Sequence, residues 1–131
     1  MKGPLSGVRV VDASEVLSGP LAAMILADQG ADVIKVETPD YGDESRQPAN
    51  YRKGMAGLYA NANHNKRSIA LNLKSSGGRE VFLDLIRSAD VFVQNWRPGA
   101  AERLAVAEED LRAVNPRLIY ASISGLSLIH I

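Results

Sequence analysis

The residues of this 131-residue chain best suited to chemistry are three cations, one aromatic side chain and one helix start. Lys74, Arg97 and Arg103 can pair with phosphate, and arginine offers a bidentate fork. Ser18-Gly19-Pro20 is typical of a helix start, where free backbone N–H groups favour an anion. Trp96 offers a flat surface for a base. Together these residues suit a phosphorylated ligand with an aromatic head, of nucleotide type.

Each of these residues also has a structural interpretation that the sequence leaves open. Arg97 and Arg103 could be solvated surface charges, and Trp96 could fill part of the core. A dinucleotide site for NAD is not expected. Glu37 stands at about the right distance for the acid of that motif, but residues 13–19 lack its glycine-rich G-x-G-x-x-G turn.

The sequence favours neither a metal site nor a phosphoacceptor. Zero cysteines exclude thiolate ligands, and His64 and His130 are far apart in the chain. A phosphoacceptor aspartate needs neighbouring acids to hold Mg²⁺. Asp12 has only Glu15 close by in sequence, so we interpret Asp12 as a loop cap. His64 lies among asparagines and is expected at the surface. We therefore expect no metal.

Composition narrows the class of protein further. Apolar residues make up 46% of the chain, and fifteen Lys+Arg balance fifteen Asp+Glu, which gives zero net charge. This balance argues against a generally basic nucleic-acid binder. The chain has no apolar run near the ~20 residues that span a bilayer and no signal core at its start. We expect no membrane partner and a cytoplasmic location.

Short apolar runs alternate with amphipathic stretches, which predicts strands separated by helices. The expected strands are 8–12, 31–37, 68–73, 90–95 and 117–123. The expected helices are 21–29, 79–88, 100–104 and 108–114. This order implies βαβ units, and hence an α/β fold whose mostly parallel sheet carries helices on both faces. We assign residues 1–131 to one such domain or to the N-terminal part of one.

Side-chain spacing also predicts how the two longer helices begin and which faces they bury. The first has Ser18 or Gly19 as its expected N-cap and Gly30 as its stop, with a core stripe of Leu21, Ala22, Ile25 and Leu26. The second follows a cap in residues 75–78, with a core stripe of Val81, Phe82, Leu85 and Ile86.

Two stretches do not fit this alternation. Residues 38–65 are rich in glycine, proline and polar side chains, and are longer than most structureless connections. We interpret them as a long loop excursion from the sheet, with one helical turn near 58–63. A disordered linker is the alternative, and three tyrosines in the stretch argue against it. Residues 126–131 are an apolar passage with no helix to close it, which we interpret as a truncated end.

The sheet brings the chemical residues together. Ligands of open parallel sheets bind beyond the carboxyl ends of the strands. In this chain those ends lead into residues 12–20, 37–46, Lys74 and 95–103, which include most of the cations and the tryptophan. We expect the nucleotide-type ligand at this edge.

A series of phrases, in order along the chain, resembles the family III CoA-transferases, the CaiB/BaiF group. The first are Gly7-Val8-Arg9-Val10-Val11-Asp12, Ser18-Gly19-Pro20, Gly30-Ala31-Asp32-Val33-Ile34-Lys35-Val36-Glu37 and Gly42-Asp43-Glu44-Ser45-Arg46. The next are residues 65–74 (NKRSIALNLK), Ala89-Asp90-Val91 and Asn95-Trp96-Arg97-Pro98-Gly99. The last are Asn115-Pro116-Arg117-Leu118-Ile119-Tyr120 and Ser122-Ile123-Ser124-Gly125. Any one phrase is weak, but the ordered set covers nearly the whole chain and is specific.

The resemblance implies a chain about three times longer, with a large Rossmann-like domain, a smaller domain and two copies interlocked as a homodimer. It implies transfer of CoA from an acyl-CoA thioester to a carboxylic acid, through an anhydride and an aspartyl-CoA thioester on a catalytic aspartate. The substrates would be acyl-CoA and a carboxylate. A related racemase branch instead moves the α-proton of a 2-methylacyl-CoA between a histidine and an aspartate.

Both reactions place the key carboxylate beyond residues 122–125. The family continues there with an aromatic residue and another glycine, whereas residues 126–131 depart from that pattern. We therefore assign no catalytic residue. The place of the aspartate is not occupied by Asp12, Asp32, Asp40, Asp43, Asp84, Asp90 or Asp110.

The positions that match the family's CoA contacts do fall inside the chain. They are Leu17, Ser18, Thr38, Leu71, Asn72, Leu73, Lys74, Asn95, Trp96, Arg97 and Arg103. Leu71 to Lys74 match the adenine and 3′-phosphate segment, residues 95–97 the pantetheine-side turn, and Arg103 a diphosphate contact. At position 38, relatives often carry an arginine that binds phosphate, and the threonine here departs from that pattern.

Three hypotheses follow. The first is the amino-terminal, CoA-binding portion of a family III enzyme, without transfer activity of its own. The second is a free-standing CoA- or nucleotide-binding module. The third is a structural remnant that does not fold stably, because an open sheet with unpaired edges invites aggregation.

Overall fold

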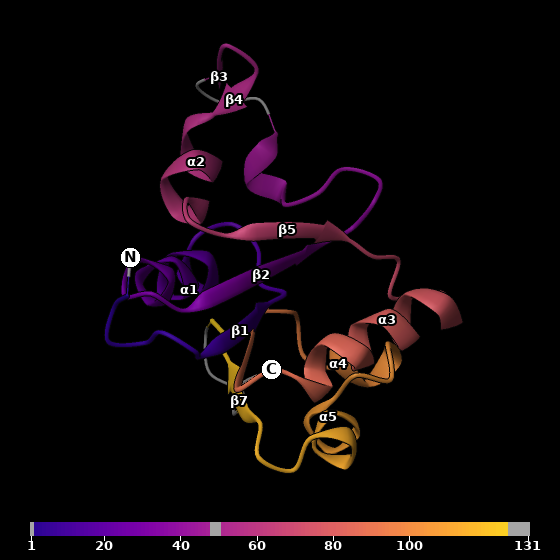
Figure 1. The fold of residues 1–131 in the computed structure, drawn as a ribbon. Helices are drawn as coiled ribbons and strands as arrows, with labels where there is room; N and C mark the ends of the chain where they lie inside the picture. The colour runs from indigo at the N-terminus through magenta and orange to yellow at the C-terminus, as the bar shows by residue number, and fades with distance from the viewer. Residues whose placement is uncertain (1, 48–50, 126–131) are drawn as a thin grey trace.

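The computed structural model describes residues 2–47 and 51–125. Its centre is a five-stranded parallel sheet in the order β5-β2-β1-β6-β7 (Figure 1). Its strands are β1 (Arg9–Asp12), β2 (Asp32–Glu37), β5 (Arg67–Ala70), β6 (Val91–Gln94) and β7 (Ile119–Ser122). The order turns back between β1 and β6, as it does in doubly wound nucleotide-binding sheets. The predicted α/β fold with a parallel sheet is confirmed.

The helices cover both faces of this sheet. They are α1 (Ser18–Asp28), α3 (Ser76–Arg87), α4 (Ala100–Arg103) and α5 (Glu108–Val114). Successive side chains of a strand point to opposite faces, and β1 shows this alternation. Val10 packs with Ala23 and Ala27 of α1, whereas Val11 belongs to the cluster on the other face, with α3 and α5.

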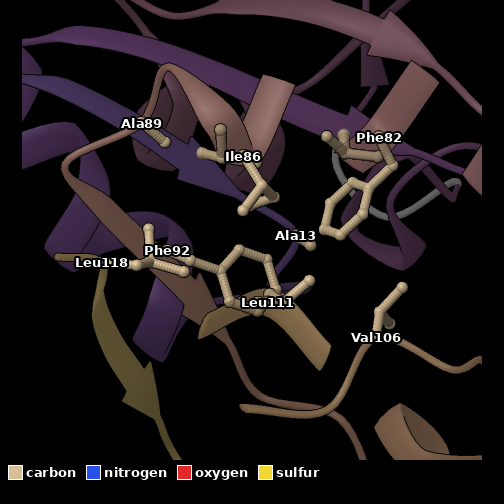
Figure 2. Close-up of a cluster of buried hydrophobic side chains, with 10 residues drawn as sticks. Ala13, Phe82, Ile86, Ala89, Phe92, Val106, Leu111 and Leu118 are labelled. Atoms are coloured by element: carbon tan, nitrogen blue, oxygen red, sulfur yellow. The ribbon is translucent and has the colours of Figure 1, made fainter. Parts of the chain in front are cut away.

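The larger core lies under α3 and α5. Phe82 and Ile86 of α3, Phe92 of β6 and Leu111 of α5 are all fully buried, and Figure 2 shows their side chains pointing toward one another. The rings of Phe82 and Phe92 meet edge to face, with centroids 5.6 Å apart. This packing fixes the strand ends that lead into the predicted site.

The two helix faces differ from the predicted stripes. In α1 the buried side chains are those of Pro20, Ala23, Met24 and Ala27, and Leu26 of the predicted stripe packs against the same core. Leu21 and Ile25 are instead 39% and 48% exposed, because the small side chains of Ala23 and Ala27 face the sheet in their place. In α3, Phe82 and Ile86 are buried as predicted, but Val81 is 43% exposed.

Two helix starts also differ. Helix α1 begins at Ser18, so its N-cap is Leu17 and not Ser18 or Gly19. Helix α3 begins at Ser76, and Ser75 caps it by accepting a hydrogen bond from the Gly78 N–H at 3.0 Å. The third predicted strand is shorter than expected, because pairing in β5 ends at Ala70.

The described part of the excursion is folded. It holds a 3₁₀ turn (Glu44–Arg46), a two-stranded antiparallel pair β3 (Tyr51–Arg52) and β4 (Met55–Ala56), and helix α2 (Gly57–Asn63), which contacts α1. The predicted helical turn near 58–63 is confirmed. His64 is exposed as predicted, and its ring lies 3.1 Å from Asp28. The predicted end at 126–131 lies outside the described residues. Within 2–47 and 51–125, no helix is long and apolar enough to cross a membrane.

Candidate functional site

A cavity of about 200 Å³ lies beyond the carboxyl ends of β1, β2 and β5. It brings together six of the residues that the sequence assigned to CoA contacts: Thr38, Leu71, Asn72, Leu73, Lys74 and Trp96. Ala13 and Glu15, which follow β1, complete one side of the cavity. The cavity lies at the edge of the sheet where the sequence predicts a ligand. The volume fits one part of a CoA molecule, because pockets for whole drug-sized ligands are larger, at roughly 300–1,000 Å³.

The segment from Leu71 to Lys74 is held by both of its faces. Leu71 and Leu73 pack against the larger core, whereas Asn72 and Lys74 are exposed. The Asn72 side chain accepts a hydrogen bond from the Lys74 N–H at 3.0 Å. The Asn72 carbonyl also lies where a Cβ on Gly78 would be, so the first turn of α3 rests directly on this segment. The alternation gives the cavity an apolar floor and a polar rim.

Trp96 both packs in the core and lines a cavity, so it combines the two alternatives that the sequence left open. Its ring is half-buried and packs against Phe92, with centroids 6.1 Å apart. The same residue lines the first cavity and a second one of about 260 Å³, which Arg97 also lines. Trp96 therefore fills part of the core and forms a wall between the two cavities.

Four predicted residues are placed differently. Leu17 and Ser18 are exposed at the start of α1, and Arg103 is exposed with its guanidinium beside Gly99. None of these three lines either cavity. The Asn95 side chain bonds to both backbone groups of Glu15, accepting from its N–H and donating to its carbonyl, each at 2.8 Å.

The electrostatics of the first cavity are mixed. Lys74 shares the lining with the carboxyl groups of Glu15, Glu37 and Asp40. Burial raises the pKa of Glu15, and the nearby Asp43 carboxylate raises it further. An anionic ligand would therefore find its partner at Lys74, and the acids would confine it to that side of the cavity.

Glu37 anchors the excursion. Its carboxylate receives two hydrogen bonds from Arg46, at 2.8 and 2.9 Å, and others from Ser68 and the Asp43 N–H. Burial opposes ionisation, but these bonds outweigh it and lower the pKa of Glu37 to about 2. In dinucleotide sites an acid at this position binds a ribose hydroxyl. Here its oxygens are already engaged, which agrees with the absence of an NAD motif.

The sequence interpretation missed two buried ion pairs beneath the excursion. Lys66 contacts Asp12 at 2.8 Å, and Lys35 contacts Asp43 at 2.7 Å, with all four side chains no more than 2% exposed. Asp12 also caps its own loop as predicted, accepting from the Ser14 N–H at 3.0 Å. A signal for Lys35 exists in the sequence, since a charge inside a buried apolar strand needs a partner.

The fold is an α/β domain whose parallel sheet has the strand order of doubly wound folds, and the candidate cavity lies at the carboxyl ends of its strands. A family model described as CoA-transferase family III matches residues 5–127. The chain belongs to this family, as the resemblance indicated.

Individual relatives agree with this assignment. The chain is 46% identical over 124 residues to an acetyl-CoA:oxalate CoA-transferase of Acetobacter aceti, covering 95% of this chain and 32% of that protein. It is 44% identical over 126 residues to a formyl-CoA:oxalate CoA-transferase of Escherichia coli O81 (strain ED1a), covering 95% of this chain and 30% of that protein. The chain thus spans about a third of the length of these relatives.

Solved structures give the same result. The crystal structure of a CAIB/BAIF family protein from Brucella suis superposes with a TM-score of 0.89 at 38% identity, covering 95% of this chain and 34% of that one. A short chain dehydrogenase/reductase family protein superposes with a TM-score of 0.50 at 17% identity, over 87% of this chain and 49% of that one. That second likeness shows the fold alone.

Proposed function

We propose that this chain is the CoA-binding portion of a family III enzyme that transfers CoA from an acyl-CoA thioester to a carboxylic acid. The observation that carries the proposal is the cavity at the carboxyl edge of the sheet. Its lining joins residues 71–74, Thr38 and Trp96, which lie far apart in sequence. The reported relatives that act on oxalate support a small dicarboxylate as the acceptor.

We assign different residues to different parts of the CoA molecule. Leu71 and Leu73 give an apolar floor to the adenine, and Lys74 provides the positive charge for the 3′-phosphate. The first turn of α1 at Leu17 and Ser18 presents backbone N–H groups to the diphosphate. Trp96 and Arg97 take the pantetheine arm across the wall between the two cavities. Arg103, which lies outside both cavities, is proposed to reach the diphosphate as a further cation.

The chemical step needs a carboxylate nucleophile, which we place on an aspartate outside these 131 residues. Its oxygen bonds to the acyl carbon while the C–S bond breaks, and the thiolate leaves with the electron pair. The thiolate then attacks the aspartyl carbonyl, which releases the donor acid and leaves an aspartyl-CoA thioester. The acceptor carboxylate displaces the thiolate to form a second anhydride. The thiolate finally attacks the acceptor's acyl carbon and frees the aspartate.

Two buried aspartates of the described residues do not suit this role. Asp12 and Asp43 are fully buried and ion-paired with Lys66 and Lys35, whereas a nucleophile must reach the thioester. We therefore propose that the 131-residue chain alone lacks transfer activity. The full-length enzyme is proposed to be an interlocked homodimer in the cytoplasm. The exposed side chains of Leu17, Leu21 and Ile25, spaced one helical turn apart, support a further chain segment or copy against α1.

The proposal is tested by removing the phosphate contacts. In calorimetric titrations with CoA, the double variant Lys74→Ala/Arg103→Ala is expected to bind at least tenfold more weakly, since each hydrogen bond to a charged group carries about 1.5–3 kcal/mol. Arg87→Ala, at the opposite end of α3, is the matched control and should leave affinity unchanged. Equal affinity in the double variant and the wild type would show that these cations do not bind the phosphates.

A further inference from the structure

The turn between β1 and α1, residues 13–17, stands where doubly wound folds carry a glycine-rich phosphate-binding turn, but it contains no glycine. Val16 has a φ of +68°, a left-handed conformation that is a genuine outlier for a β-branched residue. Such strain persists only where the surroundings over-determine it. The groups that hold Val16 in this conformation therefore also determine how the start of α1 is positioned.

Side chains from three other segments bond to the backbone of this turn. Lys35 of β2 donates to the Ser14 carbonyl at 2.9 Å. Asn95, which follows β6, bonds to both the N–H and the carbonyl of Glu15. The Val16 N–H donates to the Asp43 carboxylate at 3.1 Å. Three consecutive residues of the turn are thus held by side chains and not by a regular backbone ladder.

Asp43 is the member of this set that belongs to the excursion. It is fully buried, pairs with Lys35 through one oxygen, and through the other accepts from Val16, the Ser45 N–H and the Ser45 hydroxyl. Its own N–H bonds to Glu37 at 3.0 Å. The Asp43 carboxylate therefore connects the excursion to the turn that follows β1.

We propose that Asp43 is a positioning residue: with Lys35 and Asn95 it holds the glycine-poor β1–α1 turn in its strained shape, and so presents the first turn of α1 to the diphosphate of CoA. The ligand part of this inference rests on the proposed function. The role of Asp43 in holding the β1–α1 turn concerns the chain's own geometry and is measured separately.

A pair of double variants tests the acceptor at position 43, which holds Val16 and also Ser45. Lys35→Met/Asp43→Asn removes both buried charges but keeps an amide oxygen that can accept from Val16. Lys35→Met/Asp43→Leu removes the charges and the acceptor with a side chain of similar size. Neither variant leaves an unpaired buried charge, the main cause of large losses when one partner of such a pair is removed.

The readout is amide hydrogen exchange followed by NMR, with the Val10 and Val11 amides of β1 as internal controls. The leucine variant is expected to exchange its Val16 amide about fivefold faster than the asparagine variant, because the Val16 hydrogen bond of about 1 kcal/mol is lost. The control amides should match. Equal Val16 exchange in the two variants would overturn the bracing role of Asp43. If the leucine variant does not fold, Asn95→Ala gives the same test at Glu15, where unchanged exchange overturns the inference.

Titration of the same variants with CoA separates the two levels of the proposal. We expect the leucine variant to bind CoA several-fold more weakly than the asparagine variant. Absence of CoA binding by the wild-type chain would contradict the proposed function and leave the exchange result standing. Faster Val16 exchange with equal CoA affinity would overturn the link to the diphosphate.

Discussion

At the scale of single residues, the charged groups at the strand ends mostly hold the chain to itself. Glu37 and Lys35 are ion-paired with Arg46 and Asp43 of the excursion, and Asp12 is ion-paired with Lys66, which follows the excursion directly. Sequence could predict that buried charges need partners. It could not predict which partners, because Asp12 and Lys66 are brought together only by the folded excursion.

Glu37 makes stability depend on pH. Its pKa is lowered from the ordinary 4.5 to about 2, so its contribution is present above pH 4.5 and is lost as the pH falls from 4.5 toward 2. Glu37→Gln should lower the free energy of unfolding at pH 7 by up to about 3 kcal/mol, since one pKa unit corresponds to ~1.4 kcal/mol. Urea unfolding at several pH values measures this.

The expected signature is a gap between wild type and variant that shrinks toward pH 2. Glu80→Gln, exposed on α3, is the control and should stay near the wild type throughout. If the difference in free energy of unfolding stayed constant from pH 7 to pH 2, it would not arise from the ionised Glu37 carboxylate and its bonds to Arg46 and Ser68.

At the scale of elements, strand and helix order was predictable and helix faces were less so. Five strands lie where short apolar runs stand, because buried parallel strands need such runs. The face of α1 was wrong because periodicity weights large side chains. Ala23 and Ala27 face the sheet instead, because their small side chains let the helix pack close to it. Gly19 belongs to the same approach, since a Cβ there would overlap the Ser14 side chain.

The start of α3 provides an element-scale prediction. A Cβ on Gly78 would overlap the Asn72 carbonyl, whereas a Cβ on Gly77 meets nothing within 4 Å. Gly78→Ala should destabilise the chain by about 1–3 kcal/mol through overpacking and weaken CoA binding by moving residues 71–74. Gly77→Ala, one residue away, should be neutral or slightly stabilising.

Thermal unfolding and CoA titration of the two alanine variants provide the comparison. Similar melting temperatures for both would contradict the close packing of α3 on Asn72. A destabilised Gly78→Ala variant with unchanged CoA affinity would instead separate that packing from the binding site.

At the scale of the whole molecule, one rule recovered much of the candidate site. Because the carboxyl ends of parallel strands meet at one edge, residues after β2, β5 and β6 were expected together, and Thr38, Lys74 and Trp96 do line one cavity. Arg97 and Arg103 were not brought there, since the turn and helix after β6 carry their side chains away. The direction of such a loop is set by tertiary packing, which no local sequence pattern encodes.

NMR mapping of CoA on the ¹⁵N-labelled chain tests whether this edge of the sheet binds CoA. We expect saturable shifts in the amides of Leu71 to Lys74, in those of Ser18 and Gly19, and in the Trp96 indole. Resonances from α5 and from the amino ends of the strands should stay in place. Shifts confined to those distant residues, or no shifts at saturating CoA, would show that CoA does not bind at this edge.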